Sequence, residues 1–243
     1  MTVRLLLDKL VEWDRTGFYL INGTLRNWLF DLLMPLITDK WSFALPLSIL
    51  FLYVLLFRPK RDRTLAISAV AVLLIADATA QSLKDLFHRI RPCLVLKEAV
   101  CSSSISGLLS LASKLTHGAF LQFQDLAQKW TGHELKVAVR SGSFSFPSNH
   151  ASNLFAIATF LSYNYGRLVI PCFVAAALVG YSRIYVGSHY PTDVLAGAAL
   201  GMLEGFSIAI AVARLSPGLG KAATNQGSAR KRTVPVSDTK LSQ

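Results

Sequence analysis

Three groups of ionisable residues in this chain have the types and spacing needed to handle a phosphoryl group. In chain order they are Lys84 with Arg91, then Ser148-Asn149-His150, then Arg183 with His189 and Asp193. Phosphoryl transfer needs positive charge around the phosphoryl oxygens, a nucleophile in line with the departing oxygen, and an acid that protonates that oxygen. Lysine and arginine supply the charge, and histidine can act as nucleophile or as acid. The three groups therefore contain the parts of a phosphoryl-transfer site.

The three cations are sufficient to bind a phosphate dianion without a metal ion. Arg91 and Arg183 can hold phosphate oxygens through their forked guanidinium groups, and Lys84 adds a compact charge. The three cysteines form neither a CxxC pair nor a zinc-type spacing with histidine, so a structural metal is not expected either. We therefore predict a site without Mg²⁺ and a protein without a cofactor.

Ser148 and Asn149 lie where the chain enters an apolar helical segment. Ser148 is a suitable N-cap, and the backbone N–H groups that follow it would point at an anion. The side chain of Asn149 either donates a hydrogen bond to the phosphate or belongs to an ordinary first-turn helix residue, and the sequence leaves both interpretations open. Both residues are candidate phosphate-binding residues.

The composition indicates a membrane protein. The 243-residue chain is 52% hydrophobic and 16% charged, and its mean hydropathy of +0.43 is too high for an ordinary soluble domain. A net charge of +11 could indicate a nucleic-acid partner. However, the basic residues lie in a short loop, a tail and the three groups rather than along a stripe with interleaved aromatics. We therefore expect a lipid bilayer, and no nucleic acid, as the partner.

The apolar segments predict an all-α membrane bundle with about five spans. These spans cover roughly residues 41–57, 64–86, 149–164, 168–187 and 192–213. Residues 2–37 place leucines at helical intervals among charged side chains, which is typical of a helix at the membrane interface. We expect residues 1–220 to form one membrane domain and the polar residues 221–243 to form a disordered basic tail.

The predicted spans bring the three groups to one membrane face. The segment Lys84 to Pro92 ends the second span, Pro147 to His150 begins the third, Ser182 to His189 ends the fourth, and Asp193 begins the fifth. Antiparallel alternation places these four ends together. The opposite face carries the basic loop of residues 58–63 and should be cytoplasmic by the positive-inside rule. The site is then expected to face the periplasm or the exterior.

A long insert separates the first two groups. Residues from about 94 to 144 contain apolar side chains at helical intervals, which predicts one or two amphipathic helices outside the membrane. The insert is either a lid or acyl-chain guide, or a structural cover over the bundle. Cys93 and Cys101 lie at its start and either form a disulfide or remain thiols.

Several other polar or small residues are interpreted as structural. Asp77 and Glu204 lie inside spans, where an ionisable group is functional by default, but we interpret both as structural and expect Asp77 to bond a neighbouring helix. The stripe containing Gly197, Gly201 and Gly205 is interpreted as close packing within one bundle rather than as a dimer contact. Four further residues are expected to be interfacial or satisfied core groups, namely His88, Arg89, His117 and His133.

The order and spacing of the three groups resemble the tripartite signature of type 2 phosphatidic acid phosphatases, which are lipid phosphatases related to vanadium haloperoxidases. The matching stretches are Lys84-x6-Arg91-Pro92, Pro147-Ser148-Asn149-His150 and Ser182-Arg183-x5-His189-x3-Asp193. Asn149 departs from the family's usual glycine, which lets the backbone approach a phosphate closely. Asparagine is the next most tolerant residue, so this departure weakens the prediction of activity only slightly. The resemblance covers roughly residues 15–213 without the insert.

The resemblance implies a role for each catalytic candidate. His189 is implied as the nucleophile that forms a phosphohistidine, with Asp193 accepting the hydrogen of its other ring nitrogen. His150 is implied as the general acid. The implied reaction is metal-independent hydrolysis of a lipid phosphate or diphosphate at the outer face of the membrane.

Among family members, the chain is most similar to bacterial undecaprenyl diphosphate phosphatases, which suggests a bacterial plasma membrane and this diphosphate as substrate. Phosphatidylglycerophosphate, phosphatidic acid and lipid A 1-phosphate are alternative substrates. A haloperoxidase would be a soluble chain without five spans. A non-catalytic lipid-binding protein would have little reason to keep His150, His189 and Asp193. We therefore predict an enzyme, whose oligomeric state the sequence does not indicate.

Overall fold

A computed structural model describes residues 2–96, 99–100 and 144–215. Within these residues the chain is helical, and backbone pairing between extended segments is limited to one isolated bridge between Ile90 and Phe144. Most of the predicted insert, the tail, His117, His133 and any Cys93–Cys101 pairing lie outside the described residues. The all-α class predicted from sequence is confirmed for the described part.

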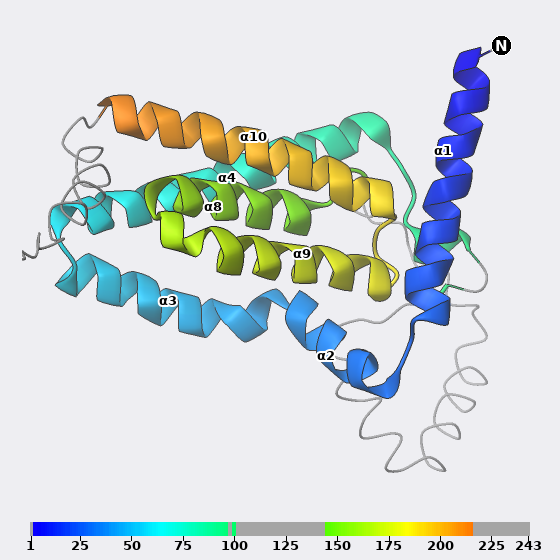
Figure 1. Cartoon of the computed structure of the whole chain (residues 1–243), viewed down its shortest axis with the longest axis horizontal. Helices are drawn as coiled ribbons and strands as arrows, with labels where there is room; N and C mark the ends of the chain where they lie inside the picture. The colour runs from blue at the N-terminus through cyan, green and yellow to red at the C-terminus, as the bar shows by residue number, and fades with distance from the viewer. Residues whose placement is uncertain (1, 97–98, 101–143, 216–243) are drawn as a thin grey trace, which may run out of the picture.

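Five helices run side by side and form the bundle (Figure 1). They are α3 (Lys40–Phe57), α4 (Lys60–Phe87), α8 (Asn149–Asn164), α9 (Val169–Tyr185) and α10 (Pro191–Leu215). In the described residues, three helical segments are long and apolar enough to cross a membrane, namely Lys60–Phe87, Gly166–Tyr185 and Pro191–Leu215. The apolar part of α3 and the 16 residues of α8 are shorter. The helices are those of an integral membrane protein, and the count of five spans stays a prediction.

Local sequence signals explain where the long helices begin and end. Pro59 precedes α4 with extended backbone angles, and His88 ends it in a left-handed conformation while donating its N–H to the Lys84 carbonyl. Pro191 is the first residue of α10, where its missing N–H costs no helical hydrogen bond. Arg91 precedes the short helix α5 (Pro92–Val95). These residues determine where the helices that carry the candidate phosphoryl-transfer residues begin and end.

The N-terminal region contains two helices joined by a π-helical turn. These are α1 (Thr2–Tyr19), η1 (Leu20–Thr24) and α2 (Trp28–Thr38). Figure 1 shows α1 crosswise at one end of the bundle, whereas α2 approaches α9. Asn22 in η1 is buried and donates from Nδ2 to the Tyr185 carbonyl at 2.7 Å, which ties the turn to the end of α9. A crosswise α1 fits the predicted interfacial helix.

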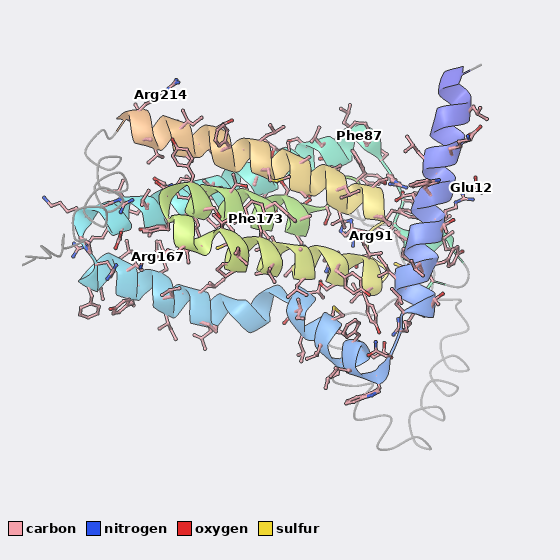
Figure 2. All side chains as sticks on the ribbon, in the orientation of Figure 1. Glu12, Phe87, Arg91, Arg167, Phe173 and Arg214 are labelled. Carbon is pink, nitrogen blue, oxygen red and sulfur yellow. The ribbon has the colours of Figure 1, made fainter. Side chains whose placement is uncertain are left out.

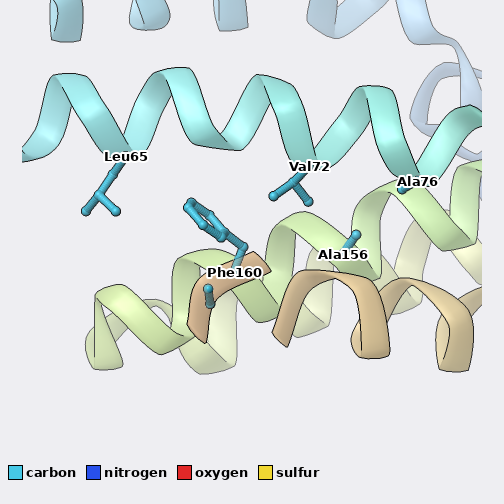
Figure 3. Packing of buried hydrophobic residues seen from close by; sticks show 6 residues of the cluster. Leu65, Val72, Ala76, Ala156 and Phe160 are labelled. Atoms are coloured by element: carbon cyan, nitrogen blue, oxygen red, sulfur yellow. The ribbon is translucent and has the colours of Figure 1, made fainter. Parts of the chain in front are cut away.

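The bundle core lies between α4, α8 and α10. Buried side chains from these helices form one apolar cluster (Figure 3): Leu65, Val72, Ala76, Ala156, Phe160 and Ala209. Burial of this apolar surface stabilises the mutual position of the three helices in the bundle. Helices α4 and α8 carry candidate site residues at the same end, so the core also fixes the site.

Close backbone contact between α10 and α8 depends on three glycines. A Cβ atom on Gly197 would lie 2.5 Å from the carbonyl oxygen of Ser148, the N-cap of α8, and one on Gly201 or Gly205 would lie 2.1 or 2.2 Å from a backbone oxygen of α8. Side chains therefore cannot fit at these positions without separating the helices. The interpretation of this stripe as packing within one bundle is confirmed. Glu204 on the same helix accepts a hydrogen bond from Thr79 of α4, a helix contact that agrees with its interpretation as structural.

The basic loop and the start of α9 form the end of the bundle opposite the site. Figure 2 shows Arg167 and Arg214 toward this end and Arg91 toward the other. Arg58 forms an ion pair with Asp62 at 2.9 Å, and Arg61 donates to the Asn164 carbonyl at 3.1 Å. Arg58 and Arg61 therefore join the loop before α4 to α4 and to the end of α8.

Candidate active site

A cavity of about 680 Å³ lies where α4 and α9 end and α8 begins. Six of the eight site residues predicted from sequence line it: Lys84, Arg91, Asn149, His150, Arg183 and His189. Apolar side chains from α3, α8 and α9 complete much of the wall, including Leu47, Leu154 and Leu178. The cavity therefore combines cations, two histidines and an apolar lining.

Ser148 and Asp193 lie behind this cavity and are buried. Ser148 is the N-cap residue of α8, but its hydroxyl makes no capping hydrogen bond and has no partner among the described residues. The predicted N-cap position is correct, but the predicted hydrogen bond from the cap side chain is not formed. The backbone N–H of Ser148 donates instead to the Asp193 carbonyl at 3.0 Å, which joins the starts of α8 and α10.

The cations of the cavity come from three separate segments. Arg183 donates from NH1 to the Thr38 hydroxyl of α2 at 2.6 Å, and its buried Nε has no partner among the described residues. Burial lowers the pKa of Arg91, because a guanidinium ion is less stable away from water. Lys84 at the end of α4 is only 4% exposed. An anion in the cavity would compensate these buried charges. Thr38 carried no sequence signal for its positioning role.

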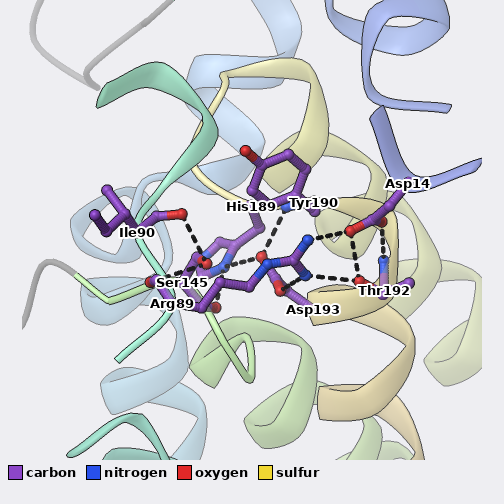
Figure 4. A network of polar contacts seen from close by, with 8 residues as sticks. All are labelled: Asp14, Arg89, Ile90, Ser145, His189, Tyr190, Thr192 and Asp193. Carbon is purple, nitrogen blue, oxygen red and sulfur yellow. Dashed lines mark hydrogen bonds and ion pairs between the residues drawn. The ribbon is translucent and has the colours of Figure 1, made fainter. Parts of the chain in front are cut away.

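The imidazole of His189 is held by a backbone group. Its Nδ1 lies 2.7 Å from the Ser145 carbonyl oxygen and 3.8 Å from Oδ2 of Asp193, and the second distance is too long for a hydrogen bond (Figure 4). A carbonyl oxygen only accepts, so Nδ1 carries the hydrogen and Nε2 keeps a free lone pair. In this geometry the backbone carbonyl of Ser145, and not Asp193, accepts the Nδ1 hydrogen, and the catalytic role of Asp193 stays a prediction. Nε2 is the ring nitrogen able to attack phosphorus.

Asp193 belongs to an ionic network beside His189. Its Oδ1 accepts from Arg89 at 2.6 Å and its Oδ2 from the Tyr190 N–H at 2.8 Å. Arg89 also pairs with Asp14 of α1, and Asp14 accepts from the Thr192 N–H at 2.8 Å (Figure 4). The interpretation of Arg89 as a satisfied group is confirmed. Sequence reasoning missed Asp14, whose only signal was a carboxylate on an amphipathic helix.

The surroundings of His189 keep its imidazole neutral. Burial, followed by the positive charges of Arg183 and Arg91, lowers the pKa of His189 to about 4, although Asp193 opposes this shift. The residue is 1% exposed, so water does not stabilise its charged form. A histidine with this pKa is unprotonated at neutral pH. It is therefore in the form that a nucleophile needs.

His150 and Asn149 begin helix α8 at the cavity wall. His150 is partly exposed to the cavity, as a proton donor to a bound group must be. The Asn149 amide donates from Nδ2 to Oδ1 of Asp77 at 3.0 Å, so this hydrogen bond joins α8 to α4. The expected contact of Asp77 with a neighbouring helix is confirmed, but Asp77 also lines the cavity, which the sequence did not indicate.

The described residues contain no cluster of three His, Cys, Asp or Glu side chains that could hold a metal ion. The cavity is lined by Lys84, Arg91 and Arg183, which do not ligate metals under ordinary conditions, together with His150 and His189. Metal independence of the reaction stays a prediction.

Comparison with known proteins agrees with this geometry. Residues 65–217 match the model of the PAP2 superfamily. Over 204 residues the chain is 27% identical to the lipid A 4'-phosphatase of Porphyromonas gingivalis, which covers 82% of this chain and 72% of that protein. An undecaprenyl-diphosphatase of Bacillus subtilis is 37% identical over 62 residues, which are 26% of this chain and 32% of that protein.

A solved structure shares the fold. The transmembrane PAP2-type phosphatidylglycerolphosphate phosphatase from Bacillus subtilis superposes with a TM-score of 0.54 at 25% identity, covering 82% of this chain and 84% of the other. The family match includes more than half of the chain and every cavity residue from Asp77 to His189. The chain therefore belongs to the PAP2 superfamily, as its motif spacing indicated, and so to a family of membrane lipid phosphatases that hydrolyse phosphoester bonds.

Proposed function

We propose that this protein hydrolyses the phosphate of a membrane lipid through a phosphohistidine at His189. One observation carries the proposal. A single cavity contains Arg183, whose buried Nε has no partner among the described residues, together with His189, whose Nδ1 donates to a backbone carbonyl. The first feature suits a bound oxyanion, and the second makes Nε2 a nucleophile.

The first step transfers the phosphoryl group to His189. Lys84, Arg91 and Arg183 hold the phosphoryl oxygens while Nε2 attacks phosphorus. The N–P bond forms as the bond from phosphorus to the lipid oxygen breaks, and His150 gives its proton to that oxygen. The ring of His189 becomes positively charged because Nδ1 keeps its hydrogen. The Asp193 carboxylate, 3.8 Å from Nδ1, stabilises this charge.

The second step releases inorganic phosphate. His150, now unprotonated, takes a proton from a water molecule that attacks phosphorus on the side opposite Nε2. The N–P bond breaks and its electron pair returns to Nε2, so that His189 is neutral again. The same three cations stabilise the transferring group in both steps, and no metal is used.

The substrate class is a lipid phosphate, and the particular lipid is a matter for experiment. Undecaprenyl diphosphate, predicted from the family resemblance, is supported by a relative that matches over a short segment and has this activity in its name. A lipid A phosphate is a second candidate, because the relative named as a lipid A 4'-phosphatase aligns with most of the chain. Phosphatidylglycerophosphate and phosphatidic acid stay as further alternatives.

The site is proposed to face the periplasm or exterior of a bacterial plasma membrane, within one domain of residues 1–220. The basic residues of the loop before α4 lie at the end of the bundle remote from the cavity, which supports a cytoplasmic position for that end. Bacterial relatives support the proposed membrane.

Phosphate release from the detergent-solubilised protein tests this function. The panel contains undecaprenyl diphosphate, a lipid A preparation, phosphatidylglycerophosphate and phosphatidic acid, each measured with EDTA present. We expect release from at least one lipid, unchanged by EDTA and absent in His189→Gln. Lack of release from every lipid, or a requirement for added Mg²⁺, would contradict the proposal.

A further inference from the structure

Three further polar side chains line the cavity beside the cations Lys84, Arg91 and Arg183. Asp77 lies on α4 seven residues before Lys84, so about 10 Å deeper along the helix. Asn149 and Asn153 lie one turn apart on α8 and line the same cavity. The mechanism above uses none of these three side chains. Asp77 is exposed, and Asn149 and Asn153 are partly buried, at the wall of the cavity.

Hydrogen bonds fix the direction of both amides. Asn149 and Asn153 donate from Nδ2 to the same oxygen of Asp77, at 3.0 and 3.3 Å. A carboxylate only accepts, so each amide must turn its nitrogen toward Asp77 and its oxygen away from it. Both amide oxygens are buried and have no hydrogen-bond partner within the described part of the chain. Two acceptors therefore lie beside the cavity without a donor.

These acceptors lie where the leaving group of the substrate would bind. His150, which gives its proton to the leaving oxygen, is three residues before Asn153 and therefore on the same side of α8. A lipid oxygen within reach of His150 places the adjoining atoms of the lipid next to Asn153 and Asp77. Buried acceptors that receive no hydrogen bond cost free energy, and a substrate that supplies donors removes this cost.

We propose that Asp77, Asn149 and Asn153 form a leaving-group subsite that binds hydroxyl or amide N–H donors next to the scissile phosphate. This inference rests on the proposed phosphatase function. The subsite favours a phosphomonoester on a sugar or glycerol unit. It disfavours a prenyl diphosphate, because the leaving group of that substrate is an anionic phosphate that the Asp77 carboxylate repels.

A matched pair of substrates tests the subsite. Lysophosphatidic acid and its 2-deoxy analogue differ by one hydroxyl next to the phosphate-bearing carbon. We expect kcat/KM of the wild-type protein to be about ten-fold or more higher for the hydroxyl-bearing lipid, the effect of one hydrogen bond to a charged group. An N-acylglucosamine phosphate lipid and its deoxy analogue form the second pair, which distinguishes a sugar from a glycerol unit.

In the variant Asp77→Asn, the ratio of kcat/KM for the hydroxyl-bearing lipid to kcat/KM for its deoxy analogue should fall close to one in any pair for which the wild-type protein shows a preference. The same variant should raise the relative kcat/KM for a prenyl diphosphate. Asn153→Ala should also reduce the ratio, and it serves if Asp77→Asn does not fold. Glu204→Gln is the control, because Glu204 is an acid at a helix contact away from the cavity lining and should keep the wild-type ratio.

The outcomes separate this inference from the proposed function. A wild-type protein without preference in either pair, or variants that slow all substrates equally, would show that the three residues only join α4 to α8. Failure of the wild-type protein to hydrolyse any member of the panel would instead overturn the phosphatase proposal and the subsite with it.

Discussion

The two ends of the helix bundle both carry basic side chains, but the groups around these side chains differ. At the end away from the site, Arg58 pairs with Asp62 and Arg61 donates to the Asn164 carbonyl. Asp62 also accepts from the Tyr165 hydroxyl at 2.7 Å. Arg58 and Arg61 are thus bound by groups of the protein, although the buried Nε of Arg61 has no partner among the described residues, and they connect the loop before α4 to α4 and to the end of α8.

At the site end, basic side chains surround a cavity. Lys84, Arg91 and Arg183 line it with His150 and His189. Arg89, which lies beyond His189, is the exception, because it is bound by Asp14 and Asp193. We infer from this comparison that a basic residue near the membrane surface points to a function when it faces a cavity with other cations, and to a structural role when acids or carbonyls surround it.

Removal of the nucleophile should give the largest effect. His189→Gln keeps a polar side chain of similar length but has no ring nitrogen to form a phosphoenzyme. We expect phosphate release to fall by roughly 10⁴-fold or more, with the thermal unfolding midpoint in detergent close to that of the wild type. Activity within about ten-fold of wild type, by the same assay, would mean that His189 is not the nucleophile.

Charge removal at the two ends should have unequal effects. Arg183→Ala is expected to lower kcat by about 10²- to 10³-fold, because it removes a donor to the transferring group. Arg183→Lys should recover part of this loss, since it restores the charge but not the fork. Arg61→Ala is the matched control at the other end. It should lower the thermal unfolding midpoint and leave kcat close to the wild-type value. Similar losses of kcat for Arg183→Ala and Arg61→Ala would remove the functional distinction between the ends.

Asp193→Asn should have a smaller effect than loss of the nucleophile. The Ser145 carbonyl would still hold Nδ1, so the variant mainly removes the charge that stabilises the phosphorylated imidazole and binds Arg89. We expect kcat to fall by about 10- to 100-fold. A direct carboxylate acceptor would lead to a loss nearer 10⁴-fold, and a loss of that size would restore Asp193 to the predicted role.

The protonation state of the His189 ring can be measured directly, without an activity assay. The pKa of the folded state is about 4, below the unfolded value of about 6.5. Its contribution to stability is therefore complete above about pH 6.5 and declines as the pH falls toward 4. In ¹⁵N-histidine spectra, the signals absent from His189→Gln should show a neutral ring with the hydrogen on Nδ1 at pH 5.5. A protonated ring at that pH would contradict the buried, cation-surrounded environment.

The fold was predictable because its signals are local. Apolar runs placed five helices close to their observed bounds. The meeting of Lys84, His150 and Arg183 in one cavity followed from alternation of the spans, since each lies near a helix end. Long apolar helices must alternate in direction, so sequence order was sufficient to place these residues at one end.

Other parts of the site depend on contacts that sequence spacing does not reveal. The acceptor of the His189 proton is the backbone carbonyl of Ser145, and any residue type could supply it. The ion pair of Arg89 with Asp14 joins residues from distant parts of the chain. Asp77 was expected to contact a helix, and the structure shows that the same contact lies at the cavity wall. Such details required the positions of the helices relative to one another.

Chemical identification of the phosphorylated residue tests the central claim most directly. The protein is mixed with a ³²P-labelled lipid phosphate, quenched with alkali within milliseconds, digested, and the labelled peptide is sequenced. We predict an acid-labile, alkali-stable label on His189, absent from His189→Gln and present in Arg61→Ala. Turnover without a labelled protein under these conditions, or a label on another residue, would contradict the account.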